Sequence, residues 1–66
     1  MEVRVMTHDP KIGDIWKWTW ESGNATYVLL TEDTGEQYFL GLDLATGVSD
    51  LWEFGAGIDE GWTFIA

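Results

Sequence analysis

The clearest pattern in the chain is a run of alternating residues between positions 12 and 21. Trp16, Trp18 and Trp20 fall on one side of an extended backbone, and the residues between them are more polar. A period of two is typical of a β-strand with one buried face. The run therefore predicts a strand whose indoles face the core, with an exposed aromatic binding strip as the alternative.

Five further segments have the composition of strands, and turn-forming residues separate them about every ten positions. No segment has a helical period. The turn signals, rich in Gly, Asn and Asp, occur at residues 22–24, 32–35, 43–47 and 55–61. The further predicted strands are residues 2–6, 26–31, 36–43, 48–54 and 62–65. In the strand at 36–43, alternation places Tyr38, Leu40 and Leu42 on a shared face.

These elements predict a single all-β domain spanning residues 1–66. Consecutive short strands joined by tight turns favour a five- to six-stranded antiparallel meander that closes into a small barrel. The segment KIGDIW at residues 11–16 resembles the Gly-Asp strand entry of SH3-like barrels, and the resemblance implies that fold. It implies no functional residue, because SH3-like barrels serve many unrelated functions.

Charge is distributed very unevenly along the chain. Twelve acids and three bases give a net charge of −9, and all three bases, Arg4, Lys11 and Lys17, precede the nine acids that follow Trp18. Such a field repels nucleic-acid phosphates and anionic membranes. We therefore expect no direct binding to nucleic acid or membrane, and a protein partner with a basic surface.

Candidate catalytic and metal-binding residues are few. The chain has no cysteine, and His8, in a turn signal near the start, is its only imidazole. Nucleophilic catalysis needs a base and an orienting group beside the nucleophile. The neighbouring carboxylates Glu32 and Asp33, like Asp59 and Glu60, lack the ligand spacing of a calcium loop. We expect no enzyme activity, no catalytic residue, no metal and no cofactor.

Two kinds of residue are candidates for contact with a partner. Acids in turns are free to steer a basic protein, and large apolar residues in or beside the glycine-rich loop at 55–61 supply affinity when buried. This loop lacks the Lys and Ser/Thr of a phosphate-binding loop. The predicted partner-binding residues are Glu32, Asp33, Glu36, Phe54, Ile58, Asp59, Glu60 and Trp62.

The hypothesis that follows is a non-enzymatic, acidic protein-binding module that acts as an adaptor or inhibitor. Its size, acidity and lack of cysteine resemble phage or mobile-element accessory proteins, including inhibitors that mimic DNA. The alternatives are a self-assembling subunit such as a viral capsid-decorating protein, which would be a homo-oligomer, and a carbohydrate or small-ligand module on the Trp face. Without an 18-residue apolar run or a basic leader, we expect a soluble cytoplasmic protein, in the host cytoplasm if phage-encoded.

Overall fold

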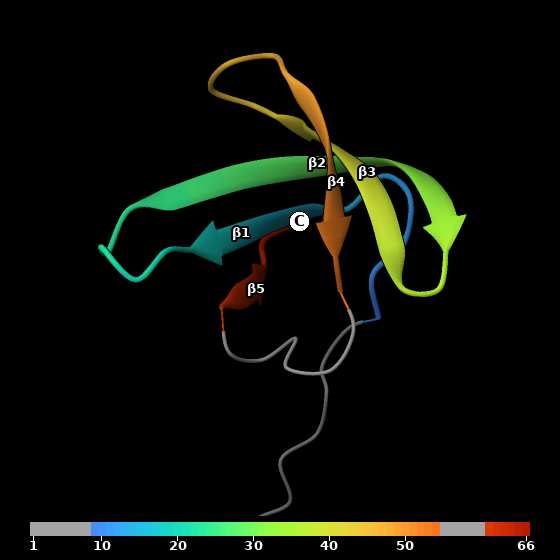
Figure 1. Cartoon of the computed structure of the whole chain (residues 1–66), viewed down its shortest axis with the longest axis horizontal. Coiled ribbons are helices and arrows are strands. Elements are labelled where there is room, and N and C mark those ends of the chain that lie inside the picture. Colours follow the sequence, from blue (N-terminus) through green and yellow to red (C-terminus); the bar gives the residue numbers. More distant parts are fainter. Residues whose placement is uncertain (1–8, 55–60) are drawn as a thin grey trace, which may run out of the picture.

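A computed structural model describes residues 9–54 and 61–66, which form one antiparallel β-sheet (Figure 1). The sheet order is β4-β3-β2-β1-β5, so β1 to β4 make a meander and β5 returns to pair with β1. The described residues contain no helix, which confirms the all-β antiparallel class. The strands are β1 (Ile15–Thr19), β2 (Ala25–Gly35), β3 (Tyr38–Asp43), β4 (Ser49–Glu53) and β5 (Trp62–Phe64).

The sheet curls, so that β4 crosses over β2 in Figure 1, but it does not close. In the described part of the chain, no backbone pairing joins β4 to β5. Side chains bridge this gap instead. The ring of Phe54 stacks on Trp62 with centroids 4.0 Å apart, and Trp62 Nε1 donates a hydrogen bond to the Glu53 carbonyl at 3.2 Å.

The first hairpin turn lies where the sequence predicts it. Trp20 N donates to the Asn24 carbonyl, and Gly23 N donates back to the Trp20 carbonyl. The turn at 43–47 is also confirmed, because Gly47 N bonds the Asp43 carbonyl at 2.8 Å. The strand expected at residues 2–6 and loop residues 55–60 lie outside the described residues.

The turn predicted at 32–35 is wrong, because β2 continues to Gly35 and the chain reverses at Glu36 and Gln37. These two residues have φ of 56° and 69°, as in the two-residue hairpin turn whose central residues are both left-handed. Two register shifts in β2 keep it paired with β3. The hydroxyls of Thr31 and Thr34 donate to β3 carbonyls, which helps to hold this irregular stretch in the sheet.

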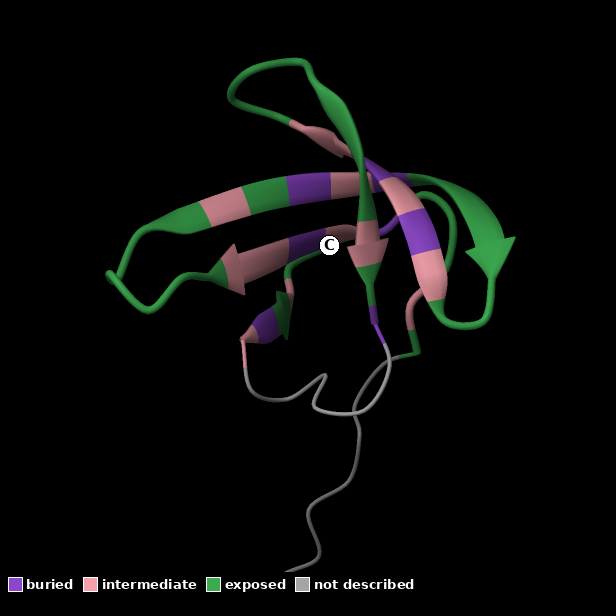
Figure 2. Ribbon diagram, viewed as in Figure 1, coloured by how far each residue is buried: buried purple, intermediate pink, exposed green. Residues whose placement is uncertain are grey.

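The two faces of β3 differ in burial (Figure 2). Tyr38, Leu40 and Leu42 share one face, as the alternation predicts, and they are half-buried. Phe39 and Gly41 are buried and face the concave side. The inward surface of β3 is therefore one aromatic ring and one bare backbone position, which leaves room for large side chains from β4.

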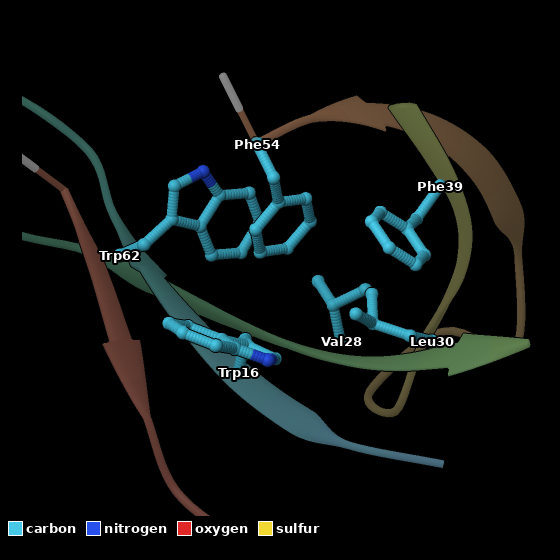
Figure 3. Close-up of a cluster of buried hydrophobic side chains, with 6 residues drawn as sticks. All are labelled: Trp16, Val28, Leu30, Phe39, Phe54 and Trp62. Atoms are coloured by element: carbon cyan, nitrogen blue, oxygen red, sulfur yellow. The ribbon is translucent and has the colours of Figure 1, made fainter. Parts of the chain in front are cut away.

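Six buried apolar residues form the core, and four of them are large aromatics that meet edge to face or stacked (Figure 3). Of the three indoles on the patterned strand, Trp16 is 2% exposed, Trp18 is half-buried and Trp20 is 46% exposed. The predicted core role therefore holds fully for Trp16 alone. The core residues are Trp16, Val28, Leu30, Phe39, Phe54 and Trp62.

Asp14 is a buried carboxylate at the entry to β1. Its Oδ2 accepts hydrogen bonds from Lys11 N at 3.0 Å and from Trp16 Nε1 at 3.2 Å. Removing such an acceptor takes one hydrogen-bond partner from the buried Trp16 Nε1 and one from the part-buried Lys11 N, at about 1–3 kcal/mol. We expect Asp14→Ala to lower the free energy of unfolding by that amount, measured by urea denaturation. Asp14→Asn, which keeps an acceptor oxygen, should lose less. Equal stability of wild type and both variants would contradict a structural role for this carboxylate.

Candidate functional site: a pocket of four tryptophans

A small open pocket lies beside the core at the end of the sheet near the first hairpin. Its volume is about 260 Å³. Pockets for drug-sized ligands span roughly 300–1,000 Å³, so this one suits a single side chain or a small head group. The lining residues are Trp18, Trp20, Trp52, Glu53 and Trp62, and we call the site the tryptophan pocket.

Three separate parts of the chain supply its walls. Trp18 lies on β1 and Trp20 directly follows that strand, so alternation puts both on the concave face. The curl of the sheet brings Trp52 over from β4. Trp62 begins β5 and pairs with Trp18 in the β1–β5 register. The pocket therefore exists only when the sheet is fully formed.

The four indoles form a closed cycle in which each ring contacts the next. The centroid separations are 5.8 Å for Trp18–Trp20, 6.3 Å for Trp20–Trp52, 5.6 Å for Trp52–Trp62 and 5.0 Å for Trp62–Trp18. The corresponding interplanar angles lie between 56° and 84°. Neighbouring rings therefore contact one another edge to face or at a steep tilt.

Trp20 is the most exposed wall, and several contacts hold it in place. Its Nε1 donates to Thr26 Oγ1 on β2 at 2.9 Å. Its ring meets Trp18 edge to face, and its backbone closes the first hairpin through Asn24. A large apolar ring fixed at the surface before a ligand arrives reduces the ordering cost of binding.

Glycines set the positions of two other walls. Gly61, whose carbonyl accepts a hydrogen bond from Thr19 N, lies so close to Trp18 that an added Cβ would come within 2.5–2.9 Å of its six-membered ring. Gly41 likewise lies close to Trp52, because a Cβ added to Gly41 would be 2.9 Å from Trp52 Cδ1. The indole N–H groups of Trp18 and Trp52 are buried and have no hydrogen-bond partner among the described residues. Packing on glycine, and not hydrogen bonding, orients both rings.

Glu53 lines the pocket with its main chain and not with its charged side chain. Adjacent strand residues point to opposite faces, so Trp52 faces the pocket while the Glu53 side chain lies on the face of its partner Tyr38. The Glu53 carbonyl already accepts the bond from Trp62 Nε1. The pocket is therefore walled by aromatic rings, without a carboxylate directed into it from the described residues.

The predicted partner-binding residues fall in different places. Glu32 and Asp33 lie exposed on β2, and Glu36 lies in the β2–β3 turn, at the end of β2 away from the first hairpin (Figure 1). None of these three lines the pocket. Phe54 is 4% exposed and packs in the core, whereas Trp62 is shared between the core and the pocket. Ile58, Asp59 and Glu60 lie outside the described residues.

Trp18, Trp20 and Trp52 are the site residues missing from the predicted set. The first two stand out in the sequence by their alternation. Trp52 shares a strand face with Phe54 and not with Leu51 or Glu53, which is the signal that places it on the concave side. Nothing in the sequence indicates that Trp52 meets Trp20, because that contact depends on the curl of the sheet.

No cluster of three or more His, Cys, Asp or Glu residues suited to a metal ion occurs within residues 9–54 and 61–66. Over the same ranges, no helix is long and apolar enough to cross a membrane. Comparison of the chain with protein-family models, with curated proteins and with solved structures gave no match.

Replacing Trp20 tests whether this wall is separate from the core. Because the ring is 46% exposed, we expect Trp20→Ala to lower the free energy of unfolding by only about 1 kcal/mol. Thermal denaturation measures the loss, and near-ultraviolet circular dichroism should report the removal of the Trp18–Trp20 ring pair. A loss as large as that of a fully buried tryptophan would show that Trp20 belongs to the core.

Proposed function

We propose that the chain is a non-enzymatic binding domain that holds a cationic side chain of a protein partner in the tryptophan pocket. One observation carries the proposal, namely the closed cycle of four inclined indole rings. Aromatic faces carry negative potential and attract a cation within about 6 Å of the ring centroid, at roughly 0.5–2 kcal/mol per contact. Four rings that line one small open pocket offer a cation several such contacts.

The charge of the whole chain supports the same ligand class. The net charge of −9 attracts a basic partner and orients it before contact. The exposed acids Glu32, Asp33 and Glu36 lie beyond the pocket, at the other end of β2. In this proposal they steer the partner, and the pocket anchors it. An adaptor and an inhibitor would both use such a surface.

We further propose that the sheet is an SH3-like barrel with an open seam. A four-strand meander followed by a fifth strand that pairs with the first supports this assignment. The Phe54–Trp62 stack spans the seam between β4 and β5. Because such barrels have many functions, this proposal adds nothing to the identity of the ligand.

Peptide titration followed by NMR tests the proposed function. The panel holds one short peptide sequence in versions whose central residue is arginine, lysine, methylated lysine or glutamine. We expect at least one cationic version to shift the indole N–H signals of the four pocket tryptophans saturably, and the glutamine version to leave them unchanged. Higher salt should weaken binding, because the long-range attraction is screened. If no cationic version binds, the proposed function is wrong.

A second candidate function, self-assembly, is favoured by apolar side chains on the convex face of the sheet. Tyr27 is 43% exposed and Leu51 is 53% exposed. Burial of this face between copies would make a structural subunit. Sedimentation equilibrium at micromolar concentration separates the two functions, since a binding domain stays monomeric and a subunit forms oligomers.

A further inference from the structure

We infer that the tryptophan pocket selects a methylated ammonium group over the unmethylated ammonium of lysine. The inference rests on the proposed function, since it names the ligand class of that same site. Trimethyllysine in a protein and choline in a small molecule carry the shared chemistry, a positive charge covered by methyl groups.

The first argument is the scarcity of hydrogen-bond acceptors among the described residues that line the pocket. The Glu53 carbonyl is engaged by Trp62 Nε1, and the Glu53 side chain lies on the other face of β4. Indole N–H groups donate and cannot accept. A lysine ammonium has three donors and is strongly hydrated. In this pocket it would lose its water and find few replacement partners among the described residues, which is costly for a charged group.

A quaternary ammonium avoids the hydrogen-bond part of this cost, because it has no N–H donor. Its methyl groups gain by leaving water for the ring faces, at about 25 cal/mol per Å² of apolar area. Its charge remains attracted to the ring quadrupoles. The same rings that fail to replace the hydration of lysine therefore favour its trimethylated form.

The dimensions of the pocket fit a compact cation. Neighbouring ring centroids are 5.0–6.3 Å apart around the cycle. A group on the open side of the pocket therefore meets several neighbouring rings, and cation–π attraction acts within about 6 Å of each ring centroid. The volume of about 260 Å³ suits one compact group.

Other ligand classes fit less well. An anion would meet the negative faces of the rings and a chain of net charge −9. A sugar could stack on the exposed face of Trp20, but its hydroxyls need polar partners, and the four other lining positions offer mostly ring surface. The negative field and the apolar walls together favour a cation whose charge is covered by apolar groups.

Isothermal titration calorimetry with four probes tests the inference. They are one peptide with lysine, the same peptide with trimethyllysine, the same peptide with the neutral analogue in which carbon replaces the charged nitrogen, and choline chloride at matched ionic strength. We expect trimethyllysine to bind at least about tenfold more tightly than lysine, which corresponds to about 1.4 kcal/mol. The neutral analogue should bind several-fold more weakly than trimethyllysine, because it keeps the shape and loses the charge.

Each other outcome has a definite meaning. Equal binding of lysine and trimethyllysine would overturn the methyl selectivity and leave the proposed function standing. Equal binding of the neutral analogue and trimethyllysine would make the pocket a plain apolar site and overturn the inference. Choline that binds as tightly as the trimethyllysine peptide supports methylammonium recognition but overturns the protein partner. If neither lysine nor trimethyllysine binds, the inference falls, and the arginine version in the panel above decides whether the proposed function falls with it.

Two variants control the measurement. Trp20→Ala removes one wall and should weaken trimethyllysine binding by about tenfold or more while the fold remains. Tyr27→Ala removes an aromatic ring that is similarly exposed but lies on the convex face. It should bind trimethyllysine as the wild type does. If Tyr27→Ala loses as much affinity as Trp20→Ala, the ligand does not sit in the tryptophan pocket, and the inference is wrong.

Discussion

Trp16→Ala is expected to lower the free energy of unfolding by about 3–5 kcal/mol, the range for deleting a fully buried large aromatic side chain. Trp16 is 2% exposed and meets Phe54, Trp62 and Phe64 edge to face at 5.4, 6.4 and 5.5 Å. Domains have about 0.05–0.15 kcal/mol of stability per residue, so this one has roughly 3–10 kcal/mol in total. The variant should therefore be largely unfolded, or melt at a much lower temperature, in calorimetry and circular dichroism.

Two neighbours on the same strand face provide the matched controls. Trp18→Ala should cost less than Trp16→Ala, because Trp18 is half-buried, and Trp20→Ala should cost least. All three changes remove the same side chain, so the order of the losses reports burial alone. Equal losses along the strand would contradict the gradient from core to pocket.

This gradient shows where prediction from the sequence ends. Alternation correctly predicts that Trp16, Trp18 and Trp20 share a face, because that depends only on the extended backbone. It makes the central Trp18 the natural candidate for deepest burial. Depth depends instead on which strands cover each position. Trp16 pairs with Val28 and Phe64 inside the sheet, whereas Trp20 lies beyond the end of β1.

The turns also include one that the sequence predicts correctly and one that it does not. The hairpin at 22–24 has Gly and Asn at the reversal, and the sequence predicts it correctly. In β2, Asp33 and Gly35 carry turn signals within a strand, and the reversal uses Glu36 and Gln37, which are unusual at positive φ. The Asp33 side chain accepts a hydrogen bond from Gly35 N, a contact typical of turns. In this structure it occurs within an irregular part of β2. Pairing with β3 outweighs the local preference.

The candidate site was harder to predict than the fold. Acidic turns and a glycine-rich loop can be recognised directly in the sequence, and they suggest that a partner is recognised by charge. The pocket combines residues from β1, β4 and β5 that are up to 44 positions apart, from Trp18 to Trp62. Pairing of β1 with β5 joins Trp18 to Trp62, and the curl of the sheet brings Trp52 to them. The acids keep a supporting role, since they set the sign of the field in which the pocket works.

Gly41→Ala is expected to lower the free energy of unfolding by roughly 3 kcal/mol, the upper end for an overpacked core. A glycine inside a strand often marks a close approach by another group. At this position an added Cβ would overlap Val28 Cγ1, which belongs to a fully buried side chain, and would lie 2.9 Å from Trp52 Cδ1. One of the two must move, and the loss is measured by urea denaturation.

A second substitution separates this steric effect from a general weakness of β3. Val28→Ala removes Cγ1, the nearest obstacle, so the double variant Gly41→Ala/Val28→Ala should be more stable than the sum of the single losses predicts, by an interaction of about 0.5–3 kcal/mol. If the two losses simply add, Val28 is not what excludes the methyl group. In the double variant the methyl group still faces Trp52, so the indole N–H signal of that residue should move and trimethyllysine binding should weaken. Unchanged stability of Gly41→Ala, with an unchanged Trp52 signal, would show that the backbone of β3 absorbs the methyl group and that Gly41 does not set the position of this wall.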